Sequence, residues 1–131
     1  FIPGLKAINK QITSEKGIRV TKLLSDLDLL GDVPLLDIKD YNGYTVNIEG
    51  NLTSGGTVTN GTLVVNGKLI PASFAVAQDG KLIVEEIETE FYASTQKMTV
   101  SGEVLVKGNV NIGYYSNIRF LQSTFGCSYG Y

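Results

Sequence analysis

Hydrophobic and polar positions alternate with a period of two over most of the chain from residue 44 to residue 115. Tyr44, Val46 and Ile48 alternate with polar residues at the start of this stretch. The same alternation returns further along, at Met98, Val100, Val104, Val106, Val110 and Ile112. This period is typical of a β-sheet with one buried side and one solvent-facing side. The sequence therefore predicts a series of short strands.

Turn residues separate these predicted strands. Four pairs stand between the apolar runs: Asn42-Gly43, Asn60-Gly61, Asn66-Gly67 and Asp79-Gly80. Each pair tolerates positive φ at both residues, as the tight turn of a β-hairpin requires. We therefore expect a mainly β fold, an antiparallel β-sandwich or a jelly-roll-like barrel. A change in the alternation near Glu85-Glu86 predicts a bulge or bend there.

Residues 1–33 show a different pattern and are predicted to be an N-terminal arm, helical or extended, in front of a β domain at residues 34–131. Pro3 suits the first position of a helix, and Leu5, Ile8 and Ile12 follow it at helical spacing.

A second short helix is predicted between Thr21 and Gly31. Leu23, Leu27 and Leu30 would line one face of it, Thr21 would cap its start and Gly31 would suit its end. Extended structure through Ile18 and Val20 is the alternative.

One internal similarity joins two distant segments. Residues 46–52 and residues 104–110 both read Val, any residue, a branched apolar residue, a charge, Gly-Asn and an apolar residue. This pair fits either a duplicated unit or one type of bulge used twice. A β-solenoid requires three or more regular coils, and the spacing between Gly-Asn pairs does not repeat, so the sequence argues against a solenoid.

Composition argues against nucleic-acid binding and against catalysis. The 131 residues are expected to form one domain, and the formal net charge of −2 comes with scattered lysines rather than a basic stripe. The chain has no His, which excludes a His-dependent triad and removes the usual acid–base residue. Ser94 and Lys97 have a catalytic spacing but lie between predicted strands. We therefore expect no enzyme activity, no catalytic residue and no cofactor.

Two acidic clusters carry the carboxylate oxygens that calcium prefers: Asp26, Asp28 and Asp32, and Glu86, Glu88 and Glu90. The EF-hand pattern is missing, so the simpler interpretation is that the aspartates solubilise a leucine-rich helix and the glutamates line a solvent-facing side. No metal site is predicted. Carbohydrate sites usually use exposed aromatic platforms, and the chain has no Trp.

Several features favour an exported protein. Asn51 and Asn60 each begin an Asn-x-Thr sequon and are candidate glycosylation sites. The first residue is Phe1, which suggests either a removed leader or a start within a longer chain. Cys127 is the single cysteine and has no partner for an internal disulfide. No apolar run approaches the ~20 residues of a transmembrane helix.

These features favour a non-enzymatic structural subunit of an extracellular or virion assembly, such as a filament, a pilus-like protein or a surface protein. The expected assembly interface is a set of apolar side chains in the arm: Phe1, Ile2, Leu5, Ile8 and Ile12. Their burial on a neighbour, or strand exchange with its sheet, would give a homo-oligomer or polymer.

The alternative is a carrier protein that binds an apolar ligand between the β-sheet and the N-terminal helix. Four apolar side chains would then line the ligand site: Ile70, Phe74, Ile87 and Phe91.

Overall fold

A computed structural model describes residues 18–53, 55–89, 97–111, 117–120 and 124–127, the last two ranges for their backbone only. The regular structure of these residues is entirely β. The strands are β1 (Ile18–Lys22), β2 (Leu27–Leu30), β3 (Leu36–Asp40), β4 (Thr45–Glu49), β5 (Gly56–Val58), β6 (Gly61–Leu69), β7 (Ser73–Val76), β8 (Gly80–Glu88), β9 (Lys97–Val100), β10 (Glu103–Val106), β11 (Val110–Asn111), β12 (Asn117–Phe120) and β13 (Thr124–Cys127). In this described part, no helix has the length and apolarity that crossing a membrane requires.

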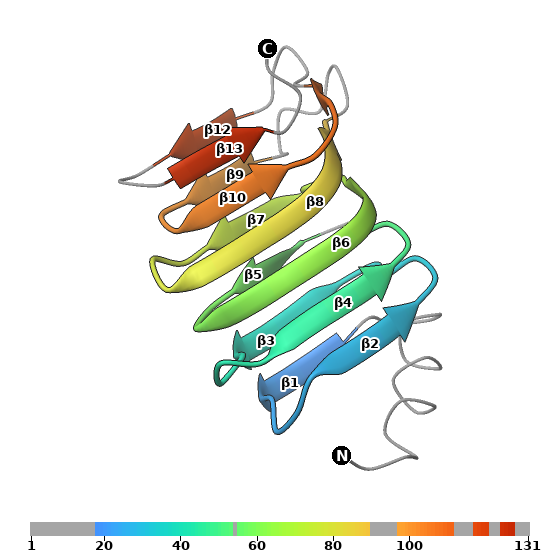
Figure 1. Cartoon of the computed structure of the whole chain (residues 1–131), viewed down its shortest axis with the longest axis vertical. Coiled ribbons are helices and arrows are strands. Elements are labelled where there is room, and N and C mark those ends of the chain that lie inside the picture. The colour runs from blue at the N-terminus through green and yellow to red at the C-terminus, as the bar shows by residue number, and fades with distance from the viewer. Residues whose placement is uncertain (1–17, 54, 90–96, 112–116, 121–123, 128–131) are drawn as a thin grey trace.

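The strands form two parallel sheets that face each other, as Figure 1 shows. One sheet has the order β1-β3-β5-β7-β9-β12, and the other has the order β13-β10-β8-β6-β4-β2, with the short β11 beside β8. Apart from β11, which follows β10 in the same sheet, consecutive strands therefore alternate between the sheets. Each pair of strands makes one coil of a β-solenoid, from the first coil (β1 and β2) to the sixth (β12 and β13).

This architecture corrects the predicted antiparallel sandwich or jelly-roll-like barrel, because every strand pair in the described residues is parallel. The prediction failed at the turns. A two-residue link between two strands is usually a hairpin. Here the link is a corner that carries the chain from one sheet to the facing sheet, and the hydrogen-bonding partner of each strand lies one coil away.

The predicted turn pairs lie at such corners or inside a strand, as three of them show. Asn42 and Gly43 both have positive φ, 54° and 81°, as predicted, but they lie at a corner between β3 and β4. Asn60 has φ 54° at the next corner. Asn66-Gly67 was predicted to be a tight turn, and this is wrong, because both residues lie inside β6.

Equivalent positions of successive coils stack in columns. Val46 of β4 pairs with Leu63, Leu63 with Leu82, and Leu82 with Val104. Val46 and Val104 begin the two similar segments found in the sequence. These two segments therefore occupy equivalent positions in two different coils. The intervals along the chain between members of the column are unequal, which explains why the sequence showed no regular repeat.

The predicted change of alternation in β8 is confirmed. Leu82 and Val84 are buried, Glu85 is exposed, and the next buried side chain is Ile87. The pairing of β6 with β8 shifts at the same level, between Val65 and Lys68. Two residues of β6 thus oppose one residue of β8, which is the definition of a β-bulge.

The core fills the space between the sheets along the whole described stack. It is one continuous cluster of buried apolar side chains: Ile18, Leu23, Leu27, Leu29, Val33, Leu36, Ile38, Tyr41, Val46, Ile48, Leu52, Val58, Leu63, Val65, Leu69, Phe74, Val76, Leu82, Val84, Ile87, Met98, Val100, Val104 and Val106. Nearly all are aliphatic, so stability rests on apolar burial within and between coils.

The predicted helix between Thr21 and Gly31 is wrong, and the extended alternative is correct for Ile18 and Val20, which lie in β1. Leu27 and Leu29 are buried while Leu30 is exposed, which is the alternation of a strand. Residues 18–33 thus make the first coil, which pairs with β3 and β4. The predicted first helix lies at residues outside the described part.

Candidate functional site

The corners between the first and second strand of each coil lie along one edge of the solenoid. At the second coil, the carboxylate of Asp40 accepts hydrogen bonds from the backbone N–H of Asn42, at 2.8 Å, and from the side-chain amide of Asn60, at 3.1 Å. These two bonds hold the pKa of Asp40 below its usual value, the Asn42 N–H being the larger cause. Both asparagines have a φ of 54°.

Aspartates also join one coil to the next. The carboxylate of Asp26 accepts from the backbone N–H of Thr45 at 2.9 Å, and that of Asp79 accepts from the backbone N–H of Asn60 at 2.9 Å. Each bond occupies a backbone donor that a corner would otherwise leave without a ladder partner. The polar residues at the corners therefore hold the edge in a fixed shape.

Glycines recur at these corners and form the floor of a groove: Gly43, Gly61, Gly80 and Gly102. A Cβ on Gly61 would overlap the Cβ of Tyr41, and a Cβ on Gly102 would overlap the carbonyl oxygens of Ala77 and Gly80. Close contact between coils thus requires glycine at these two positions. As a result, no side chain rises from the floor.

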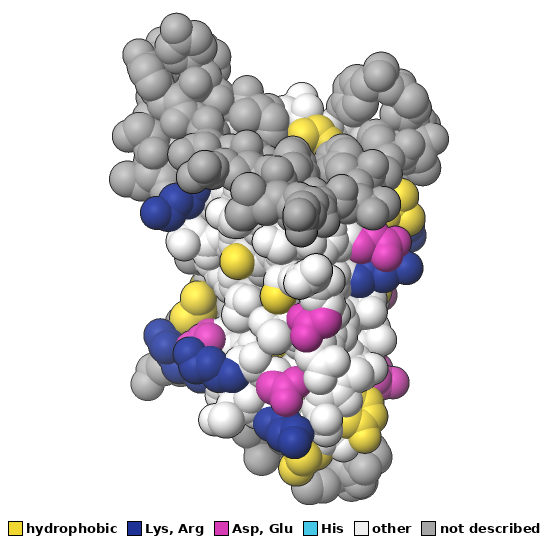
Figure 2. All heavy atoms as spheres, turned by 90° about the vertical axis from the view of Figure 1, so that its left-hand side faces the viewer, with side chains coloured by type: hydrophobic (Ala, Val, Ile, Leu, Met, Phe, Trp, Pro, Cys, Tyr) yellow, Lys and Arg dark blue, Asp and Glu magenta, His cyan; other side chains and the backbone are white. Residues whose placement is uncertain are grey.

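We call this hollow the corner groove. It has a volume of about 510 Å³, is open to solvent and runs along the solenoid axis across the second to fifth coils. Figure 2 looks onto this edge and shows that its described surface is largely uncharged, with single acidic and basic side chains scattered over it.

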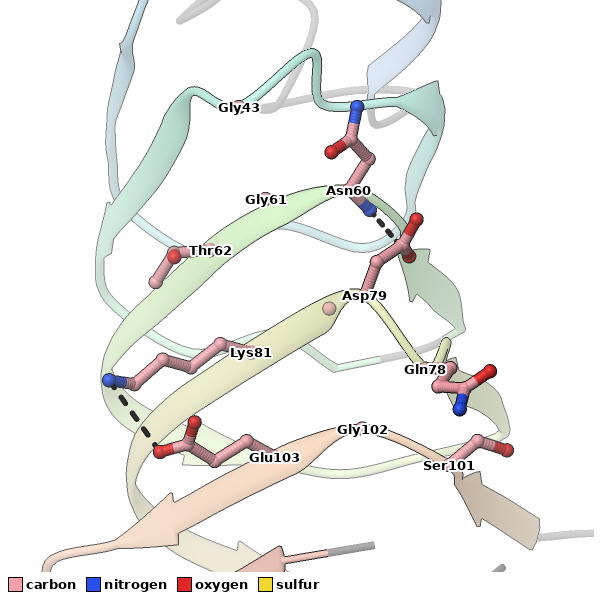
Figure 3. A pocket seen from close by; sticks show the side chains of 11 residues that line it. Gly43, Asn60, Gly61, Thr62, Gln78, Asp79, Lys81, Ser101, Gly102 and Glu103 are labelled. Atoms are coloured by element: carbon pink, nitrogen blue, oxygen red, sulfur yellow. Dashed lines mark hydrogen bonds and ion pairs between the residues drawn. The ribbon is translucent and has the colours of Figure 1, made fainter. Parts of the chain in front are cut away.

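Polar side chains form the two sides of the corner groove, as Figure 3 shows. Thr62, Lys81 and Glu103 stand side by side on β6, β8 and β10, in direct register. The opposite side carries Asn60, Gln78, Asp79 and Ser101, which come from the corners themselves.

The charges of the corner groove are already engaged. Lys81 forms an ion pair with Glu103 at 3.6 Å, and Asp79 accepts the Asn60 N–H. Two carboxylates and one ammonium group leave a small negative charge, so the groove does not attract an anion. Its free hydrogen-bonding capacity lies in uncharged side chains.

A second, smaller hollow of about 390 Å³ lies on the outer side of the sheet that contains β1. Its floor is made of small residues, among them Gly55, Gly56 and Ala72. Arg19 and Asp37 border it and form an ion pair at 3.5 Å. These groups already satisfy each other, and we assign this hollow no role.

The predicted assembly residues, Phe1, Ile2, Leu5, Ile8 and Ile12, lie outside the described residues. The two candidate glycosylation residues are described and lie at opposite ends of the strands. Asn60 is exposed and borders the corner groove. Asn51 is half-buried, and its side-chain oxygen accepts the backbone N–H of Lys68 at 2.7 Å.

In the two acidic clusters, the described carboxylates whose partners are given below bind backbone N–H groups or a lysine, and Glu90 lies outside the described residues. Asp26 and Asp32 lie at opposite ends of β2 and accept backbone N–H groups of Thr45 and Asn51. Glu86 and Glu88 flank Lys68, whose ammonium group is 3.4 Å from the first and 3.1 Å from the second, and these bonds raise the pKa of Lys68. Over the residues that the structure describes, no group of three or more acidic, Cys or His side chains has the arrangement of a metal site.

The residues named for an apolar ligand are dispersed. Phe74 and Ile87 are part of the continuous core, and Ile70 is half-buried beyond β6. Phe91 lies outside the described residues. The interior around Phe74 and Ile87 is occupied by the other side chains of the core.

The corner groove was missed in the sequence, although part of its signal was visible. The Asn-Gly and Asp-Gly pairs predict separate hairpins, whereas Gly61 and Gly80 are partners in register. Gln78 and Ser101 belong to no motif, and only the stacking of coils brings them together.

Comparison with known proteins found no relative of this chain. No protein-family model, no curated protein and no solved structure matches this chain.

Proposed function

We propose that this protein is a non-enzymatic structural subunit that joins copies of itself, in a filament, pilus-like, cell-surface or virion assembly, through its N-terminal end. One observation carries this proposal. The large apolar side chains that stand out as exposed in the described residues are Leu24, at 79%, and Leu30, at 60%. Both belong to the first coil, directly after the apolar arm.

The energy of burial supports an interface that includes both the coil and the arm. Burying a leucine side chain contributes roughly 1.5–3 kcal/mol. Leu24 and Leu30 are therefore too few for a stable interface, which typically covers about 800 Å² on each partner. Earlier in the sequence, the arm adds five apolar side chains to the proposed interface: Phe1, Ile2, Leu5, Ile8 and Ile12.

The position of the first coil in the sheets also supports an interface at the N-terminal end of the solenoid. Among the described strands, β1 and β2 are the terminal strands of their sheets. Terminal strands are the usual place where a strand from another chain is added. A neighbour that docks there would continue the parallel stacking of coils.

Composition supports a role without catalysis. The chain has no His, and several described carboxylates are engaged as corner hydrogen-bond acceptors or in ion pairs, as Asp40, Asp79 and Glu103 illustrate. The sequons at Asn51 and Asn60 favour an exported location.

The test is the oligomeric state in solution. We expect light scattering and native mass measurement of the full chain to show an oligomer or polymer. The double substitution Leu24→Asp with Leu30→Asp should give a folded monomer with a β-type circular dichroism spectrum. Val64→Asp, on the outer side of the third coil, is the matched control and should assemble like the wild type.

Two results would contradict the proposal. One is a wild type that stays monomeric at high protein concentration. The other is a Leu24→Asp, Leu30→Asp variant that still assembles.

A further inference from the structure

We propose that the end of the solenoid beside the first coil is a docking surface for residues 1–17 of the same chain, which we call the cap segment. The apolar side chains of the cap segment cover the inward-facing side chains of the first coil in each free protomer. The burial of the first coil, the lengths of the chain segments and the apolar spacing of the cap segment support this contact.

The inward side chains of the first coil are buried more completely than their described neighbours explain. Ile18, Leu27 and Leu29 are only 1%, 3% and 1% exposed. An inward side chain of a middle coil, such as Leu82, has a paired coil on each side of it. The first coil pairs with the second on one side, and the described residues place no strand on its other side. Another part of the chain therefore covers this end.

Chain length identifies the covering part. Apart from the cap segment, the longer stretches outside the described residues leave the chain at the fourth to sixth coils: 90–96, 112–116, 121–123 and 128–131. Coils are about 4.8 Å apart, so a path from the fourth coil to the first and back to the fifth measures about 33 Å.

None of these stretches can make that path. Seven residues, the longest of them, extend over at most about 25 Å. The last four residues reach about 14 Å from a coil that lies about 24 Å from the first. The cap segment, in contrast, joins the first coil directly at Ile18.

The sequence of the cap segment suits a cover with two different faces. Four of its apolar residues recur at intervals of four, three and four positions: Phe1, Leu5, Ile8 and Ile12. In a helix this spacing puts them on one face, and Lys6, Lys10 and Ser14 fall on the opposite face. The terminal coil of a solenoid requires a cap whose outer side is polar, because its apolar end would otherwise meet water.

Leu24 and Leu30 mark the limit of this cover. They belong to the same coil as Leu27 and Leu29, yet they are 79% and 60% exposed. The cover is therefore confined to the inward positions. It leaves these two leucines accessible to a partner.

The cap also restrains the proposed assembly, and this one consequence rests on the proposed function. The apolar side chains that would contact a neighbour are already held by the first coil of their own protomer. A neighbour that docks at Leu24 and Leu30 competes for them. Exchange of the cap segment between protomers then replaces one set of contacts by an identical set, as in domain swapping.

Amide hydrogen exchange of the full chain tests the cap, in the Leu24→Asp, Leu30→Asp variant that we expect to be monomeric. Adding Ile8→Asp with Ile12→Asp puts two charges on the apolar face of the cap segment. The amides of β1 and β2 should then exchange about tenfold faster or more, because the first coil loses its cover. The amides of β6 and β8 should keep their exchange rates, which shows that the rest of the solenoid is folded.

The matched control is Thr13→Asp with Ser14→Asp in the same variant. It adds the same charge to the cap segment outside the apolar face. Exchange in β1 and β2 should remain as it was before the addition.

A nitroxide label distinguishes a cap within one chain from a cap donated by a neighbour. Cys127→Ser with Lys6→Cys in the monomeric variant gives one labelling site, on the polar face of the cap segment. We expect the nitroxide to broaden the NMR signals of β1 and β2 amides more than those of β10. Isotope-labelled protein without nitroxide, mixed with nitroxide-labelled protein without the isotope, should show no broadening.

Three results would overturn the cap. They are unchanged exchange in β1 and β2 of the Ile8→Asp, Ile12→Asp protein, equal acceleration in the control, and broadening that occurs only in the mixed sample. If Ile8→Asp with Ile12→Asp also accelerates exchange in β6 and β8, the nitroxide result decides. The oligomeric state of the wild type is measured separately, so a monomeric wild type contradicts the assembly and leaves the cap in place.

Discussion

The phenolic hydroxyl of Tyr41 donates a hydrogen bond of 2.8 Å to the carbonyl oxygen of Thr57. Tyr41 stands at the corner of the second coil and Thr57 lies in β5 of the third. The ring of Tyr41 is completely buried. A polar group inside the core thus adds to the bonds at the corners, such as that from Asn60 to Asp40, in connecting these two coils.

Tyr41→Phe removes this donor and keeps the ring. Because the Thr57 carbonyl then loses a buried partner, we expect the free energy of unfolding to fall by about 1–3 kcal/mol. Urea denaturation measures the change. Tyr44→Phe is the control, since Tyr44 is only half-buried and its hydroxyl forms no hydrogen bond to another described residue. Equal losses in the two variants would contradict the assignment.

The burial of Tyr41 predicts that the stability of the protein depends on pH. Desolvation raises the pKa of Tyr41 well above the ordinary tyrosine value of about 10. Above that pH the unfolded chain releases the proton while the folded chain keeps it, so stability falls as pH rises. The advantage of the wild type over Tyr41→Phe should be constant below about pH 9 and should then shrink by about 1.4 kcal/mol per pH unit above pH 10. A constant difference up to about pH 11 would show that Tyr41 ionises normally.

Gly67 is the next test, because it lies inside β6 rather than in a turn. Its φ is not positive, but a Cβ there would overlap the carbonyl oxygen of Gly50 and lie 2.7 Å from the side-chain oxygen of Asn51. Gly67→Ala should therefore lower the free energy of unfolding by about 1–3 kcal/mol.

Gly43→Asn is the matched control for Gly67→Ala. Gly43 has φ 81° and open space around the Cβ position, and Asn tolerates this backbone conformation. The free energy of unfolding of Gly43→Asn should fall by less than about 1 kcal/mol. Thermal or urea denaturation of both variants measures the two changes. If Gly43→Asn costs more than Gly67→Ala, backbone conformation rather than coil spacing decides the glycine positions.

Neighbouring residues of β8 test the burial pattern. Leu82 is completely buried between the sheets, whereas Ile83 faces outward and is half-buried. Leu82→Ala should cost about 2–5 kcal/mol through lost contacts and a cavity. Ile83→Ala should cost about 1 kcal/mol or less. Comparable losses would mean that both sides of the sheet are covered.

Much of the local structure was predictable. Period-two alternation identified strands around Val46, Ile48 and Val104, and the change near Glu85 located the bulge. These signals depend on which side of one strand is buried, so they hold whether the neighbouring strand is parallel or antiparallel. The alternation contains no information on pairing direction, and the hairpin interpretation rests on the Asn-Gly and Asp-Gly pairs, which also suit the corners of a solenoid.

The first coil shows a different ambiguity. Leu23, Leu27 and Leu30 fit a helical stripe, but Leu27 and Leu29 also fit a strand. A short leucine-rich segment fits both the period of a helix and the period of a strand. Pairing with β3 and β4 makes this segment extended. The corner groove was unpredictable for a related reason, since Thr62, Gln78 and Ser101 meet only after three coils have stacked.

The aspartate bonds between coils have a consequence for how the chain folds. Asp26 and Thr45, Asp32 and Asn51, and Asn60 and Asp79 are each 19 residues apart. Each of these bonds therefore closes a loop of the same length, and the entropic cost of such a closure does not grow as the stack lengthens. Folding can begin at any adjacent pair of coils and advance like a zipper. During synthesis, each new coil can dock on the previous one as it leaves the ribosome, without waiting for the end of the chain.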